Sequence, residues 1–404
     1  MSKPSVLLCA FFAFTPVCVT GQQAPSFARA WQETRSFYDS TLKAEGIVGS
    51  GLMVVRGDSV LGRTSYGMAD IASGRATDSN TIYHWASITK TFTAIAIMQL
   101  RDRGLLTLDD PIVKYVPELR EVHDTFGGIE EITIRHLLSH SAGFRNPTWP
   151  WAGDKPWHPF EPTRWSQLVA MLPYTEILFK PGTRFSYSNP GFIFLGRVIE
   201  QLSGEDYEVY MEKNVLRPLG MTHTYFDRTP YHLLRYRSNN YTVKNGHPVA
   251  NGLDFDTGIT VSNGGLNAPL TDMARYLQFL VGAPGLSDDA RKVLSRSSIE
   301  EMWRPVLPNI QGDGQPDGSV GLSCFISDTK GTRLIGHTGS QASFRSFFYL
   351  NPDTRSAMIA VFNTVADDDN GHPSVETVFK GLLSRYLELI IPALRESPRE
   401  AIHR

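Results

Sequence analysis

The sequence feature that most constrains this chain is a serine where a short strand-like run meets an apolar helix, with a lysine three residues later (Ser87 and Lys90). Residues three apart on a helix are neighbours, with about 5 to 6 Å between their Cβ atoms, so the Lys90 amine can reach the Ser87 hydroxyl. The run 94–100 is apolar nearly all round, which predicts a buried, rigid helix. Burial would lower the pKa of Lys90 toward the neutral amine that a base requires. This arrangement suits a serine nucleophile with an amine base.

The same Ser-x-x-Lys pattern occurs twice more, so by itself it is a weak signal. Ser40 and Lys43 lie in a polar amphipathic stretch, which predicts a surface helix. Ser327 and Lys330 lie between two strand-like runs, which predicts a hairpin turn. The pattern alone therefore leaves both a nucleophile and an ordinary helix start open at Ser87.

The composition excludes several classes of partner. The chain has 404 residues, 41% of them hydrophobic, which is enough for one large domain or for two lobes that share a core. A formal net charge of -2 gives no electrostatic case for binding nucleic acid or an anionic membrane. We therefore expect a small-molecule or peptide substrate and no cofactor, and the oligomeric state stays open.

Residues 1–21 have the pattern of a secretory signal peptide. Their apolar run, 6–19, is short and is interrupted by Pro16, which argues against a membrane anchor. We expect an exported protein, periplasmic or secreted, with 22–404 as its mature domain and no stable membrane insertion once the signal is removed. Cys324 would then be the one remaining cysteine, so the mature chain could form no internal disulfide.

Strand-like runs open and close the chain, and helical patterns fill its middle. Two β-rich runs within 47–66 predict a hairpin, and several runs within 319–363, separated by short turns, predict an antiparallel meander. Helical patterns flank these strands at 26–45 and 374–394, and another covers 264–281. The sequence therefore predicts an α/β protein of the α+β type, in which helices flank one antiparallel sheet and a mainly helical lobe is inserted. The predicted sheet lobe covers about 26–84 and 316–394, and the helical lobe covers about 87–312.

A tyrosine and an asparagine stand two residues apart in a turn that precedes another helical pattern. Asn189 and Pro190 fit the cap and first-turn positions of that helix, which would hold Tyr187 at the turn. A buried tyrosine with no chemical role explains the same residues. A second Tyr-x-Asn, at Tyr349, falls at a predicted strand end and needs no chemistry.

A third pattern, His337, Thr338 and Gly339, closes the strand predicted to begin at Thr332. Glycine there would allow backbone or ligand to approach closely. Ser-x-x-Lys, Tyr-x-Asn and His-Thr-Gly therefore occur in this order, each at the edge of a predicted regular element.

Two histidines and two long irregular stretches leave alternatives open. His136 and His140 are four residues apart, which suits a metal ion on one helix face. No glutamate joins them as in His-Glu-x-x-His and no third ligand is evident, so structural histidines are the better interpretation and we expect no metal site. The aromatic, proline-rich stretch 146–162 is either a rim over a substrate cleft or a loop packed on itself, and 229–263 has no assignment.

The three ordered patterns resemble those of the serine β-lactamase and penicillin-recognising peptidase superfamily, most closely its class C-like branch. That branch pairs Ser-x-x-Lys with Tyr-x-Asn and with Lys-Thr-Gly or His-Thr-Gly, and class A enzymes carry related motifs. The resemblance covers nearly all of the mature chain and implies a β-lactamase/transpeptidase-like fold. Further matching segments lie at 137–144, 187–192, 218–221, 264–265 and 336–339.

The resemblance implies a role for each matched residue. Ser87 would attack a carbonyl and become acylated, Lys90 would help to remove its proton, and Tyr187 would shuttle a proton between nucleophile, leaving group and water. Whether Lys90 or Tyr187 is the general base stays open. Asn189 would hold the substrate amide, and His337 would fill the polar position of the third motif.

The resemblance also implies an oxyanion hole made by the backbone amides of Ser87 and Ser340, worth about 3 to 4 kcal/mol per donor. Thr338 and Gly339 would line the substrate beside Ser340. His337 departs from the class C β-lactamases, which have lysine there, and is more like D-amino-acid-directed peptidases and some esterases. Because an imidazole binds a carboxylate less permanently than an ammonium group does, we do not expect efficient antibiotic hydrolysis.

Three functions fit these observations. The first is an exported serine hydrolase that forms an acyl-enzyme on Ser87 and is D-Ala-D-Ala carboxypeptidase-like, D-aminopeptidase-like or β-lactamase-like. The second is a carboxylesterase of the same fold, and the third is a non-catalytic binder of cell-wall peptide. The complete set of site residues argues against the binder, since a pseudoenzyme usually loses one of them. The sequence does not specify the natural substrate.

Overall fold

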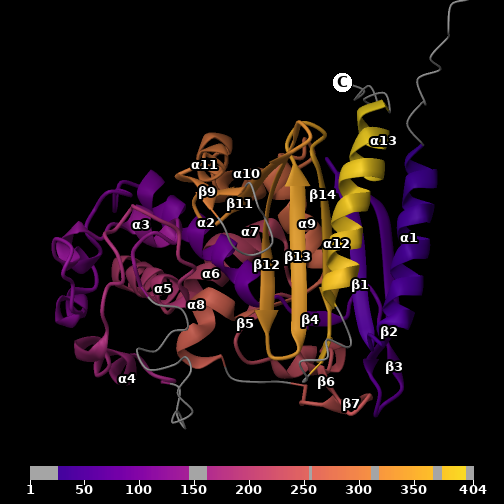
Figure 1. Ribbon diagram of the computed structural model, residues 1–404, viewed down its shortest axis with the longest axis horizontal. Coiled ribbons are helices and arrows are strands. Elements are labelled where there is room, and N and C mark those ends of the chain that lie inside the picture. The colour runs from indigo at the N-terminus through magenta and orange to yellow at the C-terminus, as the bar shows by residue number, and fades with distance from the viewer. Residues whose placement is uncertain (1–25, 145–161, 254–256, 311–317, 367–374, 397–404) are drawn as a thin grey trace, which may run out of the picture.

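The two ends of the chain meet in one nine-stranded sheet (Figure 1). This is a computed structural model, and it describes residues 26–144, 162–253, 257–310, 318–366 and 375–396. All the pairings in the large sheet are antiparallel, including the central one between β1 and β14, which confirms the predicted sheet. In spatial order its strands are β3 (Arg75–Ala76), β2 (Ser59–Asp70), β1 (Gly49–Arg56), β14 (Ser356–Phe362), β13 (Phe344–Asn351), β12 (Thr332–Gln341), β11 (Phe325–Thr329), β10 (Gly318–Val320) and β9 (Leu307–Ile310).

Helices from both ends of the chain cover one face of this sheet (Figure 1). The first, α1 (Phe27–Ala44), begins where the Ser26 side chain accepts a hydrogen bond from the Arg29 amide. Its Tyr38 and Leu42 side chains are fully buried against the sheet, as an amphipathic helix requires. The C-terminal run beside it consists of α12 (Val375–Arg385), one π-helical stretch, η9 (Tyr386–Ile390), and α13 (Ile391–Glu396).

The opposite face of the sheet carries α2 (Thr89–Asp102) and α9 (Leu270–Val281). Every α2 residue from its start through Leu100 is buried, which confirms the buried helix predicted from the apolar run. The rings of Phe92 and Tyr276 stack with their centroids 4.0 Å apart and so join α2 to α9. The helix that follows Ser87 is therefore part of the rigid core.

The middle of the chain is mostly helical, and most of it lies beside the large sheet, on the side of β11 and β12 (Figure 1). The buried apolar side chains of its helices join those of α2 and α9 in the same hydrophobic core. The α-helices are α3 (Ile134–Leu138), α4 (Trp165–Val169), α5 (Asn189–Ser203), α6 (Tyr207–Met211), α7 (Arg217–Leu219), α8 (Val261–Gly264), α10 (Asp288–Val293) and α11 (Arg296–Met302). The shorter turns are η1 (Ala86–Ile88), η2 (Ile112–Lys114), η3 (Pro117–Glu121), η4 (Ile129–Glu131), η5 (Leu172–Tyr174), the π-helical η6 (Glu212–Leu216), η7 (Tyr231–Tyr236) and η8 (Gly258–Thr260).

Two small sheets were not predicted. The first has the order β4 (Ile82–His84), β8 (Leu266–Pro269) and β5 (Tyr225–Phe226). The prediction of one helix over 264–281 is therefore wrong at its start, because 266–269 pairs with strands on both sides and Pro269 lacks an amide donor. The second sheet has the order β15 (Thr364–Ala366), β6 (Tyr241–Lys244) and β7 (His247–Ala250). Its strands β6 and β7 come from the stretch 229–263, which had no assignment from the sequence.

Two boundaries at the predicted motifs also need correction. The cap of α5 is Ser188, whose Oγ accepts the Gly191 amide at 3.2 Å, so Asn189 is the first helical residue instead of the cap. The third pattern does not close its strand, because β12 continues to Gln341 through its pairing with β13. Both corrections place motif residues inside regular elements, where the backbone fixes their direction.

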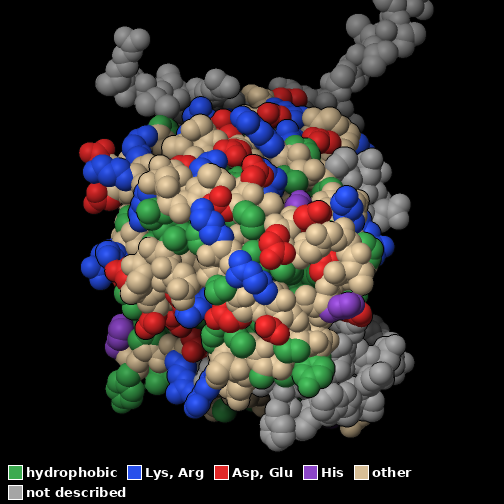
Figure 2. Space-filling view, turned by 90° about the vertical axis from the view of Figure 1, so that its left-hand side faces the viewer, with side chains coloured by type: hydrophobic (Ala, Val, Ile, Leu, Met, Phe, Trp, Pro, Cys, Tyr) green, Lys and Arg blue, Asp and Glu red, His purple; other side chains and the backbone are tan. Residues whose placement is uncertain are grey.

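The surface carries both signs of charge. On the face shown in Figure 2, Lys and Arg side chains are interspersed with Asp and Glu side chains, without a broad patch of one sign. This agrees with the net charge and gives no field that would attract a polyanion to this face. Within the described residues, no helix is both long and apolar enough to cross a membrane.

Candidate functional site

Ser87 lies in η1, the tight turn between β4 and α2. The turn starts at Ala86, which has a φ of 50°, an uncommon value for a residue with a Cβ. Trp85 anchors the turn, because its amide donates to the Leu266 carbonyl at 2.8 Å and its Nε1 donates to the Ala268 carbonyl at 2.9 Å. The hydroxyl of Ser87 is thus presented at the start of a buried helix, as the sequence predicted.

Lys90 supplies a buried amine to this serine. Its Nζ lies 3.1 Å from Ser87 Oγ and donates to the Asn263 carbonyl at 2.8 Å. The side chain is fully buried, and the ion pairs found among the described residues give it no carboxylate partner. Burial lowers the pKa of Lys90 well below its usual value, in the direction predicted for a neutral base.

Tyr187 lies on the other side of this amine. The Lys90 Nζ is 5.0 Å from the centroid of the Tyr187 ring. The same ring is 6.2 Å from the ring of His337, between centroids. The structure therefore brings together an amine, a phenol and an imidazole from three segments that are far apart in the sequence.

Asn189 opens α5 two residues after Tyr187 and is half-buried. Its carbonyl accepts a hydrogen bond from Asn263 Nδ2 at 3.3 Å, so Asn263 touches both Lys90 and Asn189. Sequence reasoning missed Asn263 as a supporting residue. Its position directly before the Gly264–Gly265 segment, which the resemblance had already matched, could have indicated it.

His337 reaches the site from β12 and is almost completely buried. Its Nδ1 is 2.6 Å from the Thr338 carbonyl oxygen, and its ring packs against Phe325 with centroids 4.9 Å apart. Burial and, secondarily, the nearby Lys90 charge lower the pKa of His337 to about 3. The imidazole is therefore neutral above acidic pH, so the third-motif position carries no fixed positive charge.

The end of β12 passes directly beside the serine turn. A Cβ on Gly339 would lie 2.2 Å from the Trp85 carbonyl oxygen, so only glycine permits this approach. The same carbonyl accepts a hydrogen bond from Ser346 on β13 at 3.0 Å. Thr338 is half-buried and Ser340 is exposed on this stretch.

One edge of β12 stays open next to the site. The pairing between β11 and β12 ends at Phe325 and Gly336, whereas β13 continues to pair with β12 as far as Gln341. Within the described residues, the edge formed by 337–341 on the β11 side therefore has no strand partner. An extended peptide could add to such an edge through main-chain hydrogen bonds.

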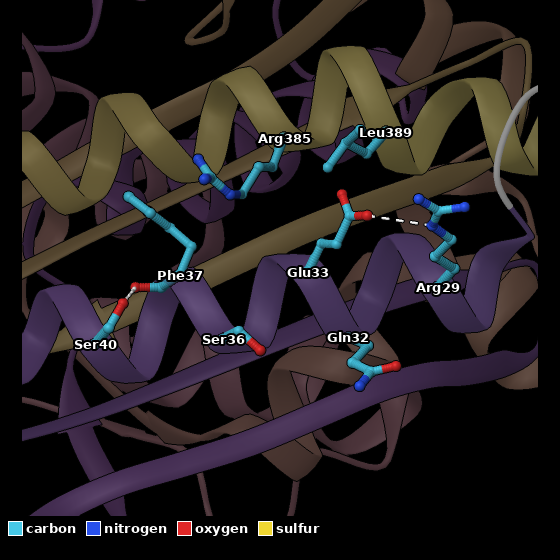
Figure 3. A pocket seen from close by; sticks show the side chains of 8 residues that line it. All are labelled: Arg29, Gln32, Glu33, Ser36, Phe37, Ser40, Arg385 and Leu389. Carbon is cyan, nitrogen blue, oxygen red and sulfur yellow. Dashed lines mark hydrogen bonds and ion pairs between the residues drawn. The ribbon is translucent and has the colours of Figure 1, made fainter. Parts of the chain in front are cut away.

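The other two Ser-x-x-Lys copies have the predicted structural roles. Ser40 is exposed on α1 and donates to the Phe37 carbonyl at 3.1 Å. It lines an open groove of about 660 Å³ between α1 and the C-terminal helices, where Arg385 lies over the Phe37 ring (Figure 3). Lys330 stands in the turn between β11 and β12 and pairs with Glu388 at 3.2 Å on the surface.

The metal alternative fails on geometry. His136 lies in α3, whereas His140 lies beyond the end of that helix with a φ of 54°, so the two rings do not share a helix face. His136 instead completes the cap of α3 by accepting the Thr133 amide at 3.3 Å. The described residues contain no group of histidine, cysteine and carboxylate side chains that could hold a metal ion.

The predicted aromatic rim at 146–162 falls almost wholly outside the described residues.

Comparison with known proteins gives consistent similarities. The family model described as Beta-lactamase matches residues 34–376. Protein flp of Staphylococcus aureus (strain COL) is 26% identical over 332 residues, which are 82% of this chain and 63% of that protein. This chain therefore spans less than two thirds of the length of that relative. Penicillin-binding protein 4* of Bacillus subtilis (strain 168) is 25% identical over 333 residues, which are 79% of this chain and 68% of that protein.

The fold is also found in solved structures. The octameric penicillin-binding protein homologue from Pyrococcus abyssi superposes with a TM-score of 0.72 at 27% identity, and the match covers 89% of this chain and 80% of that one. This similarity confirms the predicted β-lactamase/transpeptidase-like fold.

Proposed function

The chain belongs to the Beta-lactamase family, and from this we propose that it is a serine hydrolase that cleaves an amide or ester through an acyl-enzyme on Ser87. The observation that carries the proposal is the fully buried Lys90 amine, 3.1 Å from the Ser87 hydroxyl. A lysine with a lowered pKa is an effective proton acceptor at neutral pH. Such a lysine is costly to bury, and the cost is explained if the neutral amine has a chemical role.

The proposed acylation step uses the three converging groups. Ser87 Oγ forms a bond to the substrate carbonyl carbon while its proton passes to the Lys90 amine or, through it, to Tyr187. The bond to the leaving group then breaks, and the same proton neutralises the departing amine or alkoxide. Water next attacks the acyl carbon while one of its protons passes through the Lys90 and Tyr187 pair to Ser87 Oγ, and breaking of the acyl–Oγ bond releases the acid with the Ser87 hydroxyl restored. We assign no unique base within that pair.

The binding roles are part of the same proposal. The amides of Ser87 and Ser340 would stabilise the oxyanion, since they lie at the helix start and at the end of β12. Asn189 would hold the substrate amide, while Thr338 and Gly339 would align the substrate along the open edge of β12. These assignments follow the resemblance, and the positions of the residues are compatible with them.

A neutral His337 limits the classes of substrate that we expect. A substrate carboxylate would meet no fixed cation there, because the pKa of His337 is about 3. We therefore place uncharged acyl groups and amides, such as D-amino-acid amides and peptides, ahead of β-lactam antibiotics. A carboxylesterase is the second candidate, since the rings of Phe325 and Tyr187 pack against the histidine and the Phe185 ring packs against Phe325.

Covalent labelling is the first test of the proposal. Mass spectrometry after treatment with a fluorophosphonate or penicillin should show an adduct on a peptide that contains Ser87. If neither reagent labels the folded protein, the hydrolase proposal is wrong and a binder of cell-wall peptide becomes the better account.

A matched substrate pair then tests the specificity. A peptide ending in D-Ala-D-Ala and the same peptide with a C-terminal amide differ only in the carboxylate, so we expect the amide to be turned over at least as fast. Loss of turnover on amidation would show that the site recognises a carboxylate. Turnover of p-nitrophenyl esters and nitrocefin separates the esterase and β-lactamase alternatives.

Export is proposed on the sequence pattern of residues 1–21 alone, because those residues lie outside the described part of the chain. Amino-terminal sequencing of the protein recovered from the medium or periplasm should give Gln22 as the first residue. An intact residue 1 on exported protein would contradict cleavage at this position.

A further inference from the structure

One buried histidine contacts the tyrosine segment in three ways and has no role in the mechanism above. His140 is 1% exposed and lies just beyond α3. Its carbonyl oxygen accepts the Ser186 amide at 2.8 Å, and its Nδ1 accepts the Ser188 amide at 3.1 Å. Its ring stacks on the ring between them, that of Tyr187, with centroids 4.4 Å apart and planes 26° apart. Both neighbours of Tyr187 and its ring are thus held by one residue.

The protonation state of His140 is fixed by these contacts. Since Nδ1 accepts a hydrogen bond from an amide, the ring proton lies on Nε2. Burial, with Lys90 and His337 nearby, lowers the pKa of His140 well below its usual value, so the ring is neutral. Within the described residues Nε2 has no hydrogen-bond partner. The polar contacts that offset the burial of this side chain are therefore those made to the tyrosine segment.

The backbone at His140 is also unusual. A φ of 54° is uncommon for a residue with a Cβ and costs conformational energy unless its surroundings hold it. The adjacent Ser141 carbonyl accepts the Gly182 amide at 2.8 Å, so a further hydrogen bond joins this turn to the segment that leads to Tyr187. The left-handed turn therefore aims both the carbonyl and the ring of His140 at the same segment.

We propose that His140 is a positioning residue that holds the Tyr187 phenol beside Lys90 and Ser87. The inference rests on the proposed hydrolase function and adds to it a residue that the catalytic patterns do not contain. Reacting groups must be held to within a fraction of an ångström, and a displacement of about 1 Å can cost about a hundredfold in rate. A turn residue such as Tyr187 needs an external support to meet that tolerance.

Two substitutions separate the contacts that His140 makes. His140→Asn keeps an acceptor close to the position of Nδ1 and tolerates a positive φ, but it removes the stacked ring. His140→Phe keeps a ring but leaves the Ser188 amide without its acceptor. His136→Asn is the matched control, because that histidine stands four residues earlier in the chain and its ring caps α3 through the Thr133 amide.

The readout is the rate at which a fluorophosphonate labels Ser87, measured together with the thermal midpoint. We expect His140→Asn to slow labelling about tenfold and His136→Asn to leave it unchanged. Tyr187→Phe removes the phenol hydroxyl and should slow labelling about a hundredfold. In the Tyr187→Phe background, His140→Asn should cause no further loss, because the positioned hydroxyl is already absent.

The double substitution distinguishes positioning from a merely structural role. Equal slowing by His140→Asn in both backgrounds, or labelling of His140→Asn at the parent rate, would overturn the inference. If the parent protein is not labelled at all, the proposed function fails. A crystal structure of His140→Asn then decides the positioning role by itself: a displaced Tyr187 ring supports it, and a ring still 5.0 Å from Lys90 Nζ refutes it.

Discussion

Two copies of the same four-residue pattern, at Ser87 and at Ser40, have opposite surroundings in the folded chain. In both, the lysine follows the serine by three residues on or at a helix. At Ser87 the amine is buried and lies against the hydroxyl, whereas Lys43 is exposed and the Ser40 hydroxyl donates to a carbonyl of its own helix. The pattern thus sets only the spacing of the two side chains along the chain. Burial by distant segments decides whether the amine lies against the hydroxyl and can act on it.

The difference lies in what each helix faces. α2 is enclosed on all sides by the core, so water is excluded from Lys90 and its charged form is disfavoured. α1 covers one side of the sheet and leaves its outer side in solvent, where a lysine keeps its charge and a serine is an ordinary polar surface residue (Figure 3). Four predictions test this comparison.

The largest expected effect separates the two serines. Ser87→Ala should reduce covalent labelling and turnover by at least about 10⁴-fold, because it removes the nucleophile itself. Ser40→Ala removes only a hydrogen bond within α1 and should leave both rates unchanged. Intact-mass measurements on the two variants check this. Persistent labelling of Ser87→Ala would move the nucleophile to another residue.

The second prediction separates the two lysines. Lys90→Met should slow labelling of Ser87 by about 10² to 10⁴-fold, since it removes the amine that receives the proton. The same change should raise the free energy of unfolding by about 1 kcal/mol or more, because it removes a buried amine that has no carboxylate partner among the described ion pairs. Lys43→Met should alter neither quantity appreciably. Unfolding in urea and labelling kinetics on both variants measure this, and a destabilised Lys90→Met would show that the amine is well accommodated.

The third prediction concerns how stability depends on pH. Buried histidines lie in the part of the molecule around Ser87, whereas no histidine lines the groove at Ser40. Burial lowers the pKa of His337 and of His84 to about 3 in the folded chain, against about 6.5 when unfolded. Between these values the unfolded chain binds more protons, so stability is complete above about pH 6.5 and falls as the pH drops toward 3. Each histidine contributes at most about 1.4 kcal/mol per pH unit in that window.

Urea unfolding at several pH values measures this slope, and His337→Gln is its control. That variant should lose the contribution of one histidine and become less sensitive to acid than the parent. A parent protein whose stability is flat between pH 6.5 and 5 would contradict the neutral, buried state of both rings.

The smallest effect is expected at the third copy of the pattern. Lys330 and Glu388 form an ion pair in which both side chains are mostly exposed, so solvent screens it. Lys330→Ala should leave the thermal midpoint and the labelling rate unchanged within experimental error. A clear loss of activity would show that the β11–β12 turn acts on the site through β12.

The parts of the fold that the sequence predicted correctly are those set by local periodicity. The apolar α2, the β1–β2 hairpin, the C-terminal meander and α1 each carry a repeat that buries one side or all sides of an element. β8 was assigned to a helix because only its neighbours β4 and β5, which pair with it from positions 40 to 187 residues earlier in the chain, make it a strand. The extension of β12 to Gln341 likewise depends on its register with β13.

The site shows the same division. Ser87 and Lys90 are neighbours because of helix geometry, so their contact followed from spacing. Asn263 and His140 were not predicted as part of the site, because their contacts with Lys90 and with the Tyr187 segment join parts of the chain that no local pattern relates.

The sequence by itself determined which side chains are present, their order and the elements on which they stand. Only the tertiary structure decided which serine lies beside a neutral amine, because removing a lysine from water requires several packed segments at once. It also decided that the imidazole of His337 is uncharged and that His140 stacks on Tyr187. Burial is a property of the assembled chain, and here the charge state of each group follows from it.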